Sequence, residues 1–408
     1  MLDLFAGCGG LTDGFMQTNC YEDIAAVEWK APQVRTLRNR LKTKWGKKDA
    51  DDSVLHFDIQ REDELFYGWK DDPVFGSSLG LDYYVKKSNG IDIIIGGPPC
   101  QAYSVAGRVR DEKGMQDDYR NYLFEHYLSI VDRYQPDVFV FENVPGILSA
   151  APHGVKVAEV IPREFEKKGY IITNKLSKAI VNAADYNVPQ NRKRIIMLGV
   201  RKQSFSEKDI QEMLNDFYLN ILPSHKGQKV ISVKEAIGGL PTLKPYWDEE
   251  HHSKKVSHST PVCDITWHEP RYNNLRDMDT FRLLAEDLES GNPTFDSKKI
   301  AKLYEEKVGS KSPIHRYHVL NPNQPSTTII AHLHKDGNRF IHYDSKQART
   351  ITPREAGLLQ SFDIDFPFIG ARGHVYEMIG NAVPPKLAKA LAESVVEFLK
   401  KYKPEKYA

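Results

Sequence analysis

Short apolar runs alternate with helical stretches through the first half of the chain. The runs are rich in Ile, Val and Phe, and each closes on Gly, Pro or an acidic residue, which is typical of buried strands. Residues 120–134, between the last two runs, have apolar side chains at helical spacing. The alternation predicts an α/β fold, with helices on both faces of a parallel sheet. The predicted strands are residues 2–5, 24–29, 56–59, 91–96 and 137–143.

Two further apolar runs, residues 169–176 and 194–200, lie close enough in the chain to complete the sheet as an antiparallel pair. An amphipathic pattern over residues 385–401 predicts a helix near the C-terminus. We therefore expect the C-terminal segment to return to the same domain as the sheet.

The pattern becomes irregular after residue 201, where prolines are scattered and only residues 206–219 and 277–289 predict helices. Such a stretch is typical of a separate, loop-rich domain. The division that follows is a large domain over residues 1–204, a smaller one over residues 205–322, and a return to the large domain over residues 323–408.

Composition limits the class of protein without naming it. The 408 residues suffice for a large domain and a smaller one, and the net charge of +1 does not by itself indicate a nucleic acid partner. Four widely spaced cysteines without a CxxC pair argue against a zinc ribbon or a disulfide framework. No apolar run is long enough to span a bilayer, and the start lacks a signal-peptide pattern. We expect a cytoplasmic protein without a membrane partner.

The first predicted strand runs directly into a glycine-rich turn, DLFAGCGG at residues 3–10, and then into a helix. Glycines at such a turn let the backbone approach a ligand closely. Thr12 stands where GxGxxG would have its third glycine, which weakens a dinucleotide interpretation. Glu28 and Asp58 close the next two strands and suit a ribose and an adenine amino group. The combination favours a nucleoside cofactor that has no phosphates.

Cys100 follows another strand directly, within the segment GGPPCQ at residues 96–101. Open α/β sheets bind ligands at the carboxyl ends of their strands, so Cys100 is expected to face the same crevice as the glycine turn. A lone cysteine is usually a small buried hydrophobe. However, two prolines keep this one out of a helix interior, at a strand end, where a nucleophile would stand.

An acid and two arginines complete the set of candidate groups. Glu142 ends the strand after Cys100 and suits proton donation or capping of the next element. Alternation along a strand would point Arg192 and Arg194 to the same side. These guanidinium groups are either ligands for a carbonyl or a phosphate, or ordinary surface charges.

Taken in order, these motifs resemble the full motif series of the cytosine-C5 DNA methyltransferases of bacterial restriction–modification systems. The matching segments run from residue 2 to about residue 386 and follow the family's order. Several independent motifs that agree in order are far more specific than any one of them. The segments are DLFAGCGG, VEW, FDI, GGPPCQAYS, FENV, NVPQNRKR, ARTITPREAGLLQSF and GNAVPP.

The resemblance implies a DNA (cytosine-5-)-methyltransferase with a Rossmann-like, class I S-adenosylmethionine-dependent domain. Cys100 would attack C6 of a cytosine flipped out of a specific duplex sequence. Glu142 would hold N3 and the amino group of the base. Arg194 would contact its carbonyl, and Arg192 would support the site.

The resemblance also implies a pocket for S-adenosyl-L-methionine, with S-adenosyl-L-homocysteine as the product. Glu28 would bind the ribose, Trp29 the adenine face and Asp58 the adenine amino group. The family often has Phe where Pro98 stands, so one aromatic wall of this pocket is expected to be missing. The other residues that would line the pocket are Phe5, Gly7, Gly9, Gly10, Pro98, Leu123 and Asn381.

Further expectations concern the smaller domain and the partners. By resemblance, residues 205–322 form a target-recognition domain that binds double-stranded DNA. The histidines between His251 and His268 match no zinc spacing, so we expect no metal. We expect a monomer, associated with the bacterial nucleoid, that protects the site of a cognate restriction endonuclease.

Three alternatives are weaker. A tRNA-directed branch of the same family carries a Cys-Phe-Thr tripeptide, which this chain lacks. A catalytically silent DNA-binding relative would not need Cys100, Glu142, Arg192 and Arg194 together. An amino-methylating enzyme would have Asp or Asn before Pro-Pro and an aromatic residue after it, where this chain has Gly97 and Cys100.

Overall fold

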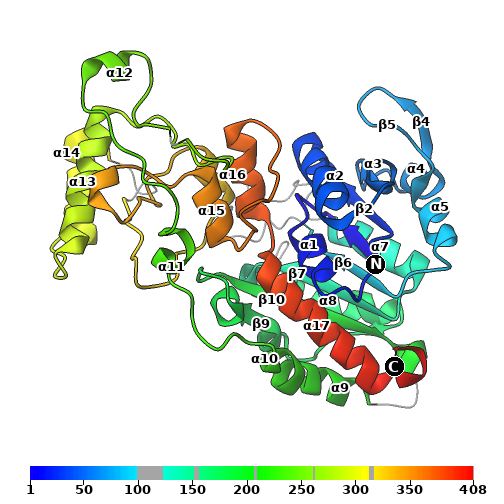
Figure 1. Cartoon of the computed structure of the whole chain (residues 1–408). Helices are drawn as coiled ribbons and strands as arrows, with labels where there is room; N and C mark the ends of the chain where they lie inside the picture. The colour runs from blue at the N-terminus through cyan, green and yellow to red at the C-terminus, as the bar shows by residue number, and fades with distance from the viewer. Residues whose placement is uncertain (99–122, 151–155, 206–208, 261, 312–316, 408) are drawn as a thin grey trace. The chain divides into compact units, whose positions relative to one another are not determined.

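The chain divides into two compact units (Figure 1). Unit 1 consists of Met1–Tyr186, Lys193–Gln228 and Val383–Ala408, and unit 2 of Asn187–Arg192 and Lys229–Ala382. The computed structural model describes residues 1–98, 123–150, 156–205, 209–260, 262–311 and 317–407.

Unit 1 is built on a mostly parallel sheet whose described strands follow the order β3-β2-β1-β6-β7-β10-β8, with β9 also paired to β10. The first five strands are parallel, and β10 runs antiparallel to β7 and β8, which confirms the predicted antiparallel end of the sheet. The strands are β1 (Leu2–Leu4), β2 (Ala25–Glu28), β3 (Val54–His56), β6 (Ile93–Gly96), β7 (Val138–Asn143), β8 (Tyr170–Ile171), β9 (Ile180–Asn182) and β10 (Lys193–Arg201).

Two strand ends differ from the predicted ones. Phe5 has a left-handed backbone (φ 59°), so β1 stops at Leu4. β3 ends at His56, because the chain then turns and the side chain of Asp58 accepts a hydrogen bond from the backbone of Gln60. Both ends therefore lie in a turn, where the apolar pattern continues but the strand does not.

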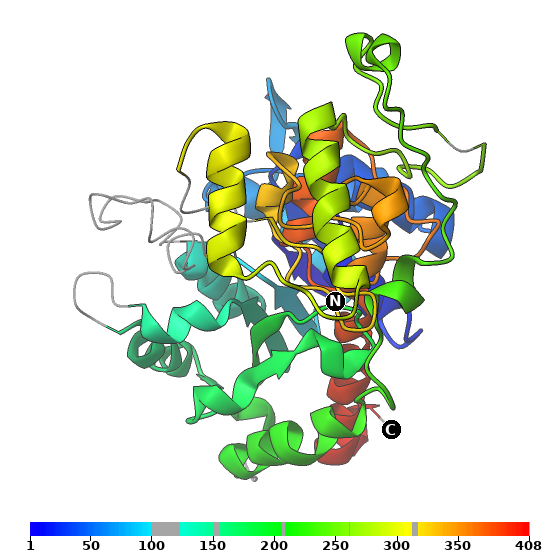
Figure 2. The same ribbon diagram turned by 90° about the vertical axis from the view of Figure 1, so that its left-hand side faces the viewer.

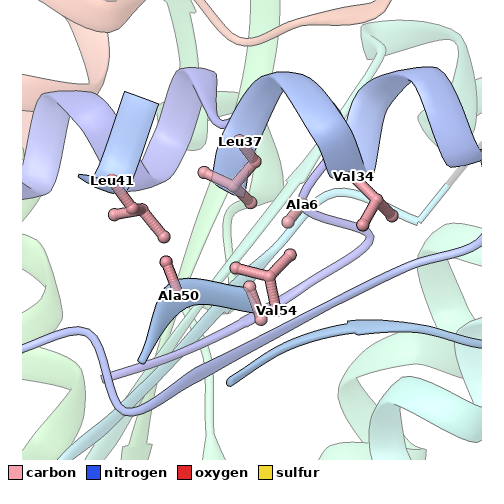
Figure 3. Packing of buried hydrophobic residues seen from close by; sticks show 7 residues of the cluster. Ala6, Val34, Leu37, Leu41, Ala50 and Val54 are labelled. Carbon is pink, nitrogen blue, oxygen red and sulfur yellow. The ribbon is translucent and has the colours of Figure 1, made fainter. Parts of the chain in front are cut away.

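Helices cover the sheet of unit 1, and close packing of α2 on the first strands shows how (Figure 3). The buried side chains of Val34, Leu37 and Leu41 pack against Ala6 and Val54. The longer helices of this unit are α1 (Gly10–Met16), α2 (Ala31–Trp45), α4 (Glu62–Tyr67), α5 (Gly80–Lys87), α7 (Leu123–Tyr134), α8 (Val157–Lys167), α9 (Ile210–Asp216) and α17 (Pro385–Tyr402). A small two-stranded ribbon, β4 (Trp69–Asp72) with β5 (Gly76–Ser78), precedes α5.

The C-terminal helix α17 packs on α1, as the return of the chain to unit 1 requires (Figure 1). Gly14 permits this contact, because a Cβ there would lie only 2.4 Å from the Cβ of Ala388. The helix predicted over residues 385–401 is thus confirmed, one residue longer at its end.

Unit 2 contains helices joined by long irregular segments, and no strand longer than an isolated bridge among its described residues. Its largest helices, α13 and α14, share an apolar core that includes Phe281, Leu284 and Leu303 and lie near each other in both views (Figures 1 and 2). The helices are α11 (Val233–Ile237), α12 (Glu249–Ser253), α13 (Leu275–Glu289), α14 (Ser297–Val308), α15 (Pro353–Leu359) and α16 (Arg372–Asn381).

The boundaries of the units differ from the predicted ones at residues 205 and 323. Residues 205–228 stay with unit 1 because the hydroxyl group of Tyr218 donates to the carbonyl of Ile196 and accepts from the amide of Leu198 in β10. Residues 323–382 stay with unit 2, where buried polar contacts hold them. The chain therefore returns to unit 1 at Val383.

Candidate active site at the sheet edge

Most of the predicted site residues of unit 1 lie at the carboxyl ends of adjacent parallel strands. Register places Leu4 of β1 beside Val27 of β2 and Gly96 of β6, and Gly96 beside Phe141 of β7. The chain order reverses between β1 and β6, and open α/β sheets bind their ligands at such a switch point. The edge thus brings the glycine turn, Glu28 and the segment after β6 together with Glu142.

The glycine turn between β1 and α1 is built from left-handed residues. Phe5, Gly7 and Gly9 have φ values of 59°, 57° and 92°. A Cβ on Gly9 would lie 2.5 Å from the Cδ1 of Leu37, so that side chain would have to shift, and the left-handed backbone at Gly9 also favours glycine. A Cβ on Gly7 would meet no atom of the described residues within 4 Å, so the backbone of Gly7 borders open space. Gly10 starts α1.

Glu28 is held over this turn by backbone donors. Its two carboxylate oxygens accept hydrogen bonds from the amides of Gly7 (2.9 Å) and Lys30 (2.7 Å). Burial raises the pKa of Glu28, against the lowering effect of these two amides. Trp29, the residue after β2, is 53% exposed, which is unusual for a tryptophan next to a buried strand.

Asp58 lies two residues after β3, the strand beside β2. Its Oδ1 atom accepts from the amide of Gln60 (3.1 Å), and the side chain is only partly buried. The three strand-end positions Glu28, Trp29 and Asp58 therefore stand in a row beside the glycine turn.

Asp3, which the sequence did not single out as a site residue, is fully buried at this turn. It accepts a hydrogen bond from the hydroxyl of Thr12 (2.5 Å), while its Oδ1 atom has no hydrogen-bond partner within the described part of the chain. Burial raises the pKa of Asp3 to about 8, although the hydrogen bond from Thr12 opposes the shift. The hydrogen bond from Thr12 to Asp3 connects α1 to β1. In the sequence it corresponds to an Asp and a Thr separated by eight residues.

Gly97 and Pro98 follow β6 and border Glu142. A Cβ on Gly97 would lie 2.5 Å from the Oε2 atom of Glu142, so only glycine leaves room for the carboxylate in this position. The side-chain amide of Asn143 donates to the carbonyl of Pro98 (3.4 Å) and connects the ends of the two strands. Cys100 itself lies outside the described residues, as does the segment of residues 99–122.

Glu142 and Arg194 form an ion pair across β7 and β10. The Oε1 atom of Glu142 lies 2.8 Å from the Nε atom of Arg194, and each side chain is 12% exposed. Burial lowers the pKa of Arg194, and the carboxylate of Glu142 opposes that shift. The pair leaves the Oε2 atom of Glu142 against Gly97, on the side from which the chain leads to Cys100.

Two other predicted residues, Arg192 and Asn381, belong to unit 2. Arg192 precedes β10, which begins at Lys193, so strand alternation does not place it beside Arg194. Its guanidinium group is buried in unit 2. Asn381 is exposed at the end of α16 in the same unit. Leu123 is buried at the start of α7 in unit 1.

The histidine-rich segment of unit 2 uses its rings to bind its own backbone. The Nε2 atoms of His252, His258 and His268 lie 2.7–2.8 Å from the carbonyl oxygens of Tyr246, Gln347 and Pro241. Across the described residues, no group of three or more His, Cys, Asp or Glu side chains is arranged to hold a metal ion. No described helix is both long and apolar enough to cross a bilayer.

Comparisons with known proteins agree with this architecture. Residues 1–397 match the family described as C-5 cytosine-specific DNA methylase. The chain is 31% identical to the type II methyltransferase M.Bpa9945I of Bacillus paralicheniformis, with 98% of this chain and 99% of the relative covered. It is 30% identical to the type II methyltransferase M.XorII of Xanthomonas oryzae pv. oryzae (99% and 86% covered).

Among solved structures, the chain is similar to a protein described as a DNA modification methyltransferase encoded within an E. coli prophage. The TM-score is 0.57 at 25% sequence identity, over 98% of this chain and 99% of the other. The mostly parallel sheet with its switch point is the Rossmann-like fold expected from the sequence. The chain belongs to the C-5 cytosine-specific DNA methylases and is a DNA cytosine methyltransferase of the type II restriction–modification kind.

Proposed function

We propose that the chain transfers a methyl group from S-adenosylmethionine to C5 of a cytosine flipped out of a specific duplex sequence, through a covalent adduct with Cys100. The observation that carries this proposal is the Glu142–Arg194 pair. It lies against Gly97, three residues before Cys100, beside the glycine turn at the switch point of the sheet.

The residues at the glycine turn fit the cofactor. Open space at Gly7 suits the close approach of a ligand to the backbone, and Glu28 keeps acceptor capacity for ribose hydroxyls. The exposed Trp29 provides an aromatic face on which an adenine can stack, and the partly buried Asp58 would accept from the adenine amino group. When bound, the cofactor supplies an electrophilic methyl group on its sulfonium.

The chain's own residues supply the rest of the chemistry. The Cys100 thiolate adds to C6, and the electron pair of the C5–C6 double bond becomes available at C5 for the methyl group. Glu142 holds N3 and the amino group, while Arg194 binds the carbonyl oxygen of the base. A base then removes the C5 proton, the double bond reforms, and the C6–S bond breaks with return of the thiolate.

Access to C6 requires that the base leave the stack, because both faces of C5 and C6 are covered inside a duplex. We assign recognition of the surrounding DNA to residues 205–322, with Asn381 completing the cofactor residues, as the family resemblance implies. The biological role that fits is a cytoplasmic, monomeric enzyme that protects the sites of a cognate restriction endonuclease.

Expression in a bacterial host that lacks cytosine methylation, followed by genome-wide mapping of 5-methylcytosine, tests this function. We expect methylation at one short sequence motif, absent from cells that express Cys100→Ala. Methylation of tRNA instead of DNA would assign the chain to the RNA-directed branch. Absence of 5-methylcytosine from both would contradict the proposal and favour a silent DNA-binding relative.

A further inference from the structure

The guanidinium group of Arg192 donates hydrogen bonds to the backbone of unit 2. The side chain is 1% exposed, and it donates to the carbonyl oxygens of Ile329 (2.8 Å), Gly380 (2.9 Å) and Ala382 (3.0 Å). One nitrogen, Nη2, serves both Gly380 and Ala382, the neighbours of Asn381 on either side. The backbone that carries Asn381 is therefore held from both ends by a single group.

Two buried glutamines extend this set of hydrogen bonds, which we call the Arg192 clamp. Gln360 donates to the carbonyl of Ala382 (2.5 Å), and Gln190 donates to the side-chain carbonyl of Gln360 (2.5 Å). The side-chain carbonyl of Gln190 in turn accepts from the amide of Ile329 (2.9 Å). Buried networks of this kind are rigid when their members are satisfied, because each lost bond leaves a desolvated polar group.

Gly380 brings the end of α16 directly onto the neighbouring segment. A Cβ at this position would lie 2.3 Å from the amide nitrogen of Ala331 and 2.4 Å from the carbonyl carbon of Ile330. These are backbone atoms, which cannot move aside as a flexible side chain can. The turn at Gly380–Ala382 is thus seated against residues 330–331, while the side chain of Asn381 remains exposed.

Arg192 also precedes Lys193, the first residue of β10, and Arg194 follows one residue later. The clamp therefore holds the chain immediately before the arginine that pairs with Glu142. We infer that Arg192 is a positioning residue that couples the turn carrying Asn381 to the base-binding Arg194. This inference rests on the proposed roles of Asn381 and Arg194, and it states how Arg192 would support the site.

Arg354 provides a matched control within unit 2. It too is fully buried and donates to backbone carbonyls, those of Thr266 (2.9 Å), Asp363 (3.2 Å) and Phe366 (3.0 Å). None of these carbonyls adjoins Asn381 or the start of β10. Arg354→Lys therefore removes the same type of interaction without touching the proposed coupling.

The experiment compares Arg192→Lys with Arg354→Lys in the full chain. We expect both variants to lose thermal stability to a similar degree. Only Arg192→Lys is expected to weaken the binding of S-adenosylhomocysteine, measured by calorimetry without DNA, and to lower kcat, each by about 10- to 100-fold. Both readouts are taken well below the unfolding temperatures of the two variants.

Equal behaviour of the two variants at similar stability would overturn the inference and leave Arg192 a structural residue. A loss of kcat with unchanged S-adenosylhomocysteine affinity would overturn it as well, because the turn around Asn381 would then be independent of Arg192. If Arg192→Lys fails to fold, Gln360→Met removes the other donor to Ala382 and is expected to give the same pattern; unchanged affinity and kcat would contradict the inference. Failure of the proposed function would instead appear in the unaltered protein, as absence of methylation.

Discussion

The two units place their buried charges in different surroundings. In unit 2, both carboxylate oxygens of Glu355 bind the guanidinium group of Arg349 (2.6 and 2.7 Å), and the amide of Thr352 donates to one of them (2.7 Å). At the sheet edge of unit 1, Glu28 is met by two backbone amides, and the Glu142–Arg194 pair remains partly exposed.

The buried charges of unit 2 stabilise its irregular segments, whereas those at the sheet edge of unit 1 keep polar atoms available to a ligand. Unit 2 has no described sheet to satisfy its backbone, so a buried network of side chains connects its irregular segments. In unit 1 the sheet satisfies the hydrogen bonds of the backbone. The side chains at its strand ends can therefore keep hydrogen-bonding capacity for a ligand. We therefore expect substitutions at the edge to change chemistry and substitutions in the network to change stability.

The largest effect is expected at Glu142. Glu142→Gln removes the ion pair with Arg194 and the carboxyl group that, by the proposed mechanism, holds N3 and the amino group of the base, so activity should fall by about 10²- to 10⁴-fold. Asp82→Asn is the matched control, because Asp82 also pairs with an arginine of unit 1, Arg133, but lies at α5, away from the edge. Methyl transfer rates at a temperature where both variants are folded test this. Equal activities of the two variants would remove Glu142 from the mechanism.

Glu355→Gln should have the largest effect on stability. It leaves Arg349 charged and buried without its carboxylate partner, which costs about 3–5 kcal/mol. Glu306→Gln, which removes an exposed partner of Lys302 on α14, should stay within about 0.5 kcal/mol. Denaturant unfolding of the two variants measures the difference, and similar midpoints would show that the buried network does not hold unit 2 together.

Acid should weaken unit 2 at a pH where Asp3 still favours the folded state of unit 1. Burial lowers the pKa of His342 to about 3 and that of His258 to about 4. Because the unfolded imidazoles take up protons below about pH 6.5, each costs roughly 1 kcal/mol of stability per pH unit as the pH falls from there towards 4. Asp3 has the opposite sign: its pKa of about 8 means that the folded state gains stability as the pH falls from 8 to 4.

Hydrogen exchange resolved by segment checks this contrast between pH 7 and pH 5. Amides of α13 and α15 in unit 2 should lose protection before those of β1 and β6 in unit 1, after correction for the intrinsic exchange rates. Uniform loss of protection in both units would contradict the assignment of the acid-sensitive groups to unit 2.

The smallest effect is expected at Glu28. Glu28→Gln keeps the shape of the side chain and removes its charge, so S-adenosylhomocysteine should bind about tenfold more weakly, close to 1.4 kcal/mol. Asp51→Asn, on an exposed pair with Lys42, serves as the control and should not change the affinity. Undiminished affinity in Glu28→Gln would place the cofactor elsewhere.

The contrast between the units also explains how much could be predicted from the sequence. The strands of unit 1 are buried on both faces and therefore show as continuous apolar runs, each closed by the residue that ends it. The positions of Glu28, Trp29 and Glu142 at the strand ends follow from that pattern. The misplaced ends at Phe5 and after His56 arose where an apolar residue occupies a turn.

The fold of unit 2 could not be predicted from the sequence, because it depends on contacts between residues that are far apart in the chain. Gln190 reaches Gln360, and the buried Arg349 forms its pair with Glu355 inside a capping box that begins at Thr352. The Thr-x-x-Glu spacing and the Asp296 and Gly309 caps of α14 were readable signals for helices that the apolar pattern alone did not predict. Strand alternation does not predict the direction of the Arg192 side chain, because β10 begins one residue later, at Lys193.

The proposed mechanism requires a covalent bond between Cys100 and C6 of the target cytosine. Once the methylated motif is known, a duplex that carries 5-fluorocytosine at the target position is incubated with the protein and S-adenosylmethionine. With no C5 proton to lose, the adduct cannot break down, so we predict a complex that survives denaturation and maps to a peptide containing Cys100. Absence of this complex, or its formation by Cys100→Ala, would contradict a covalent mechanism through Cys100.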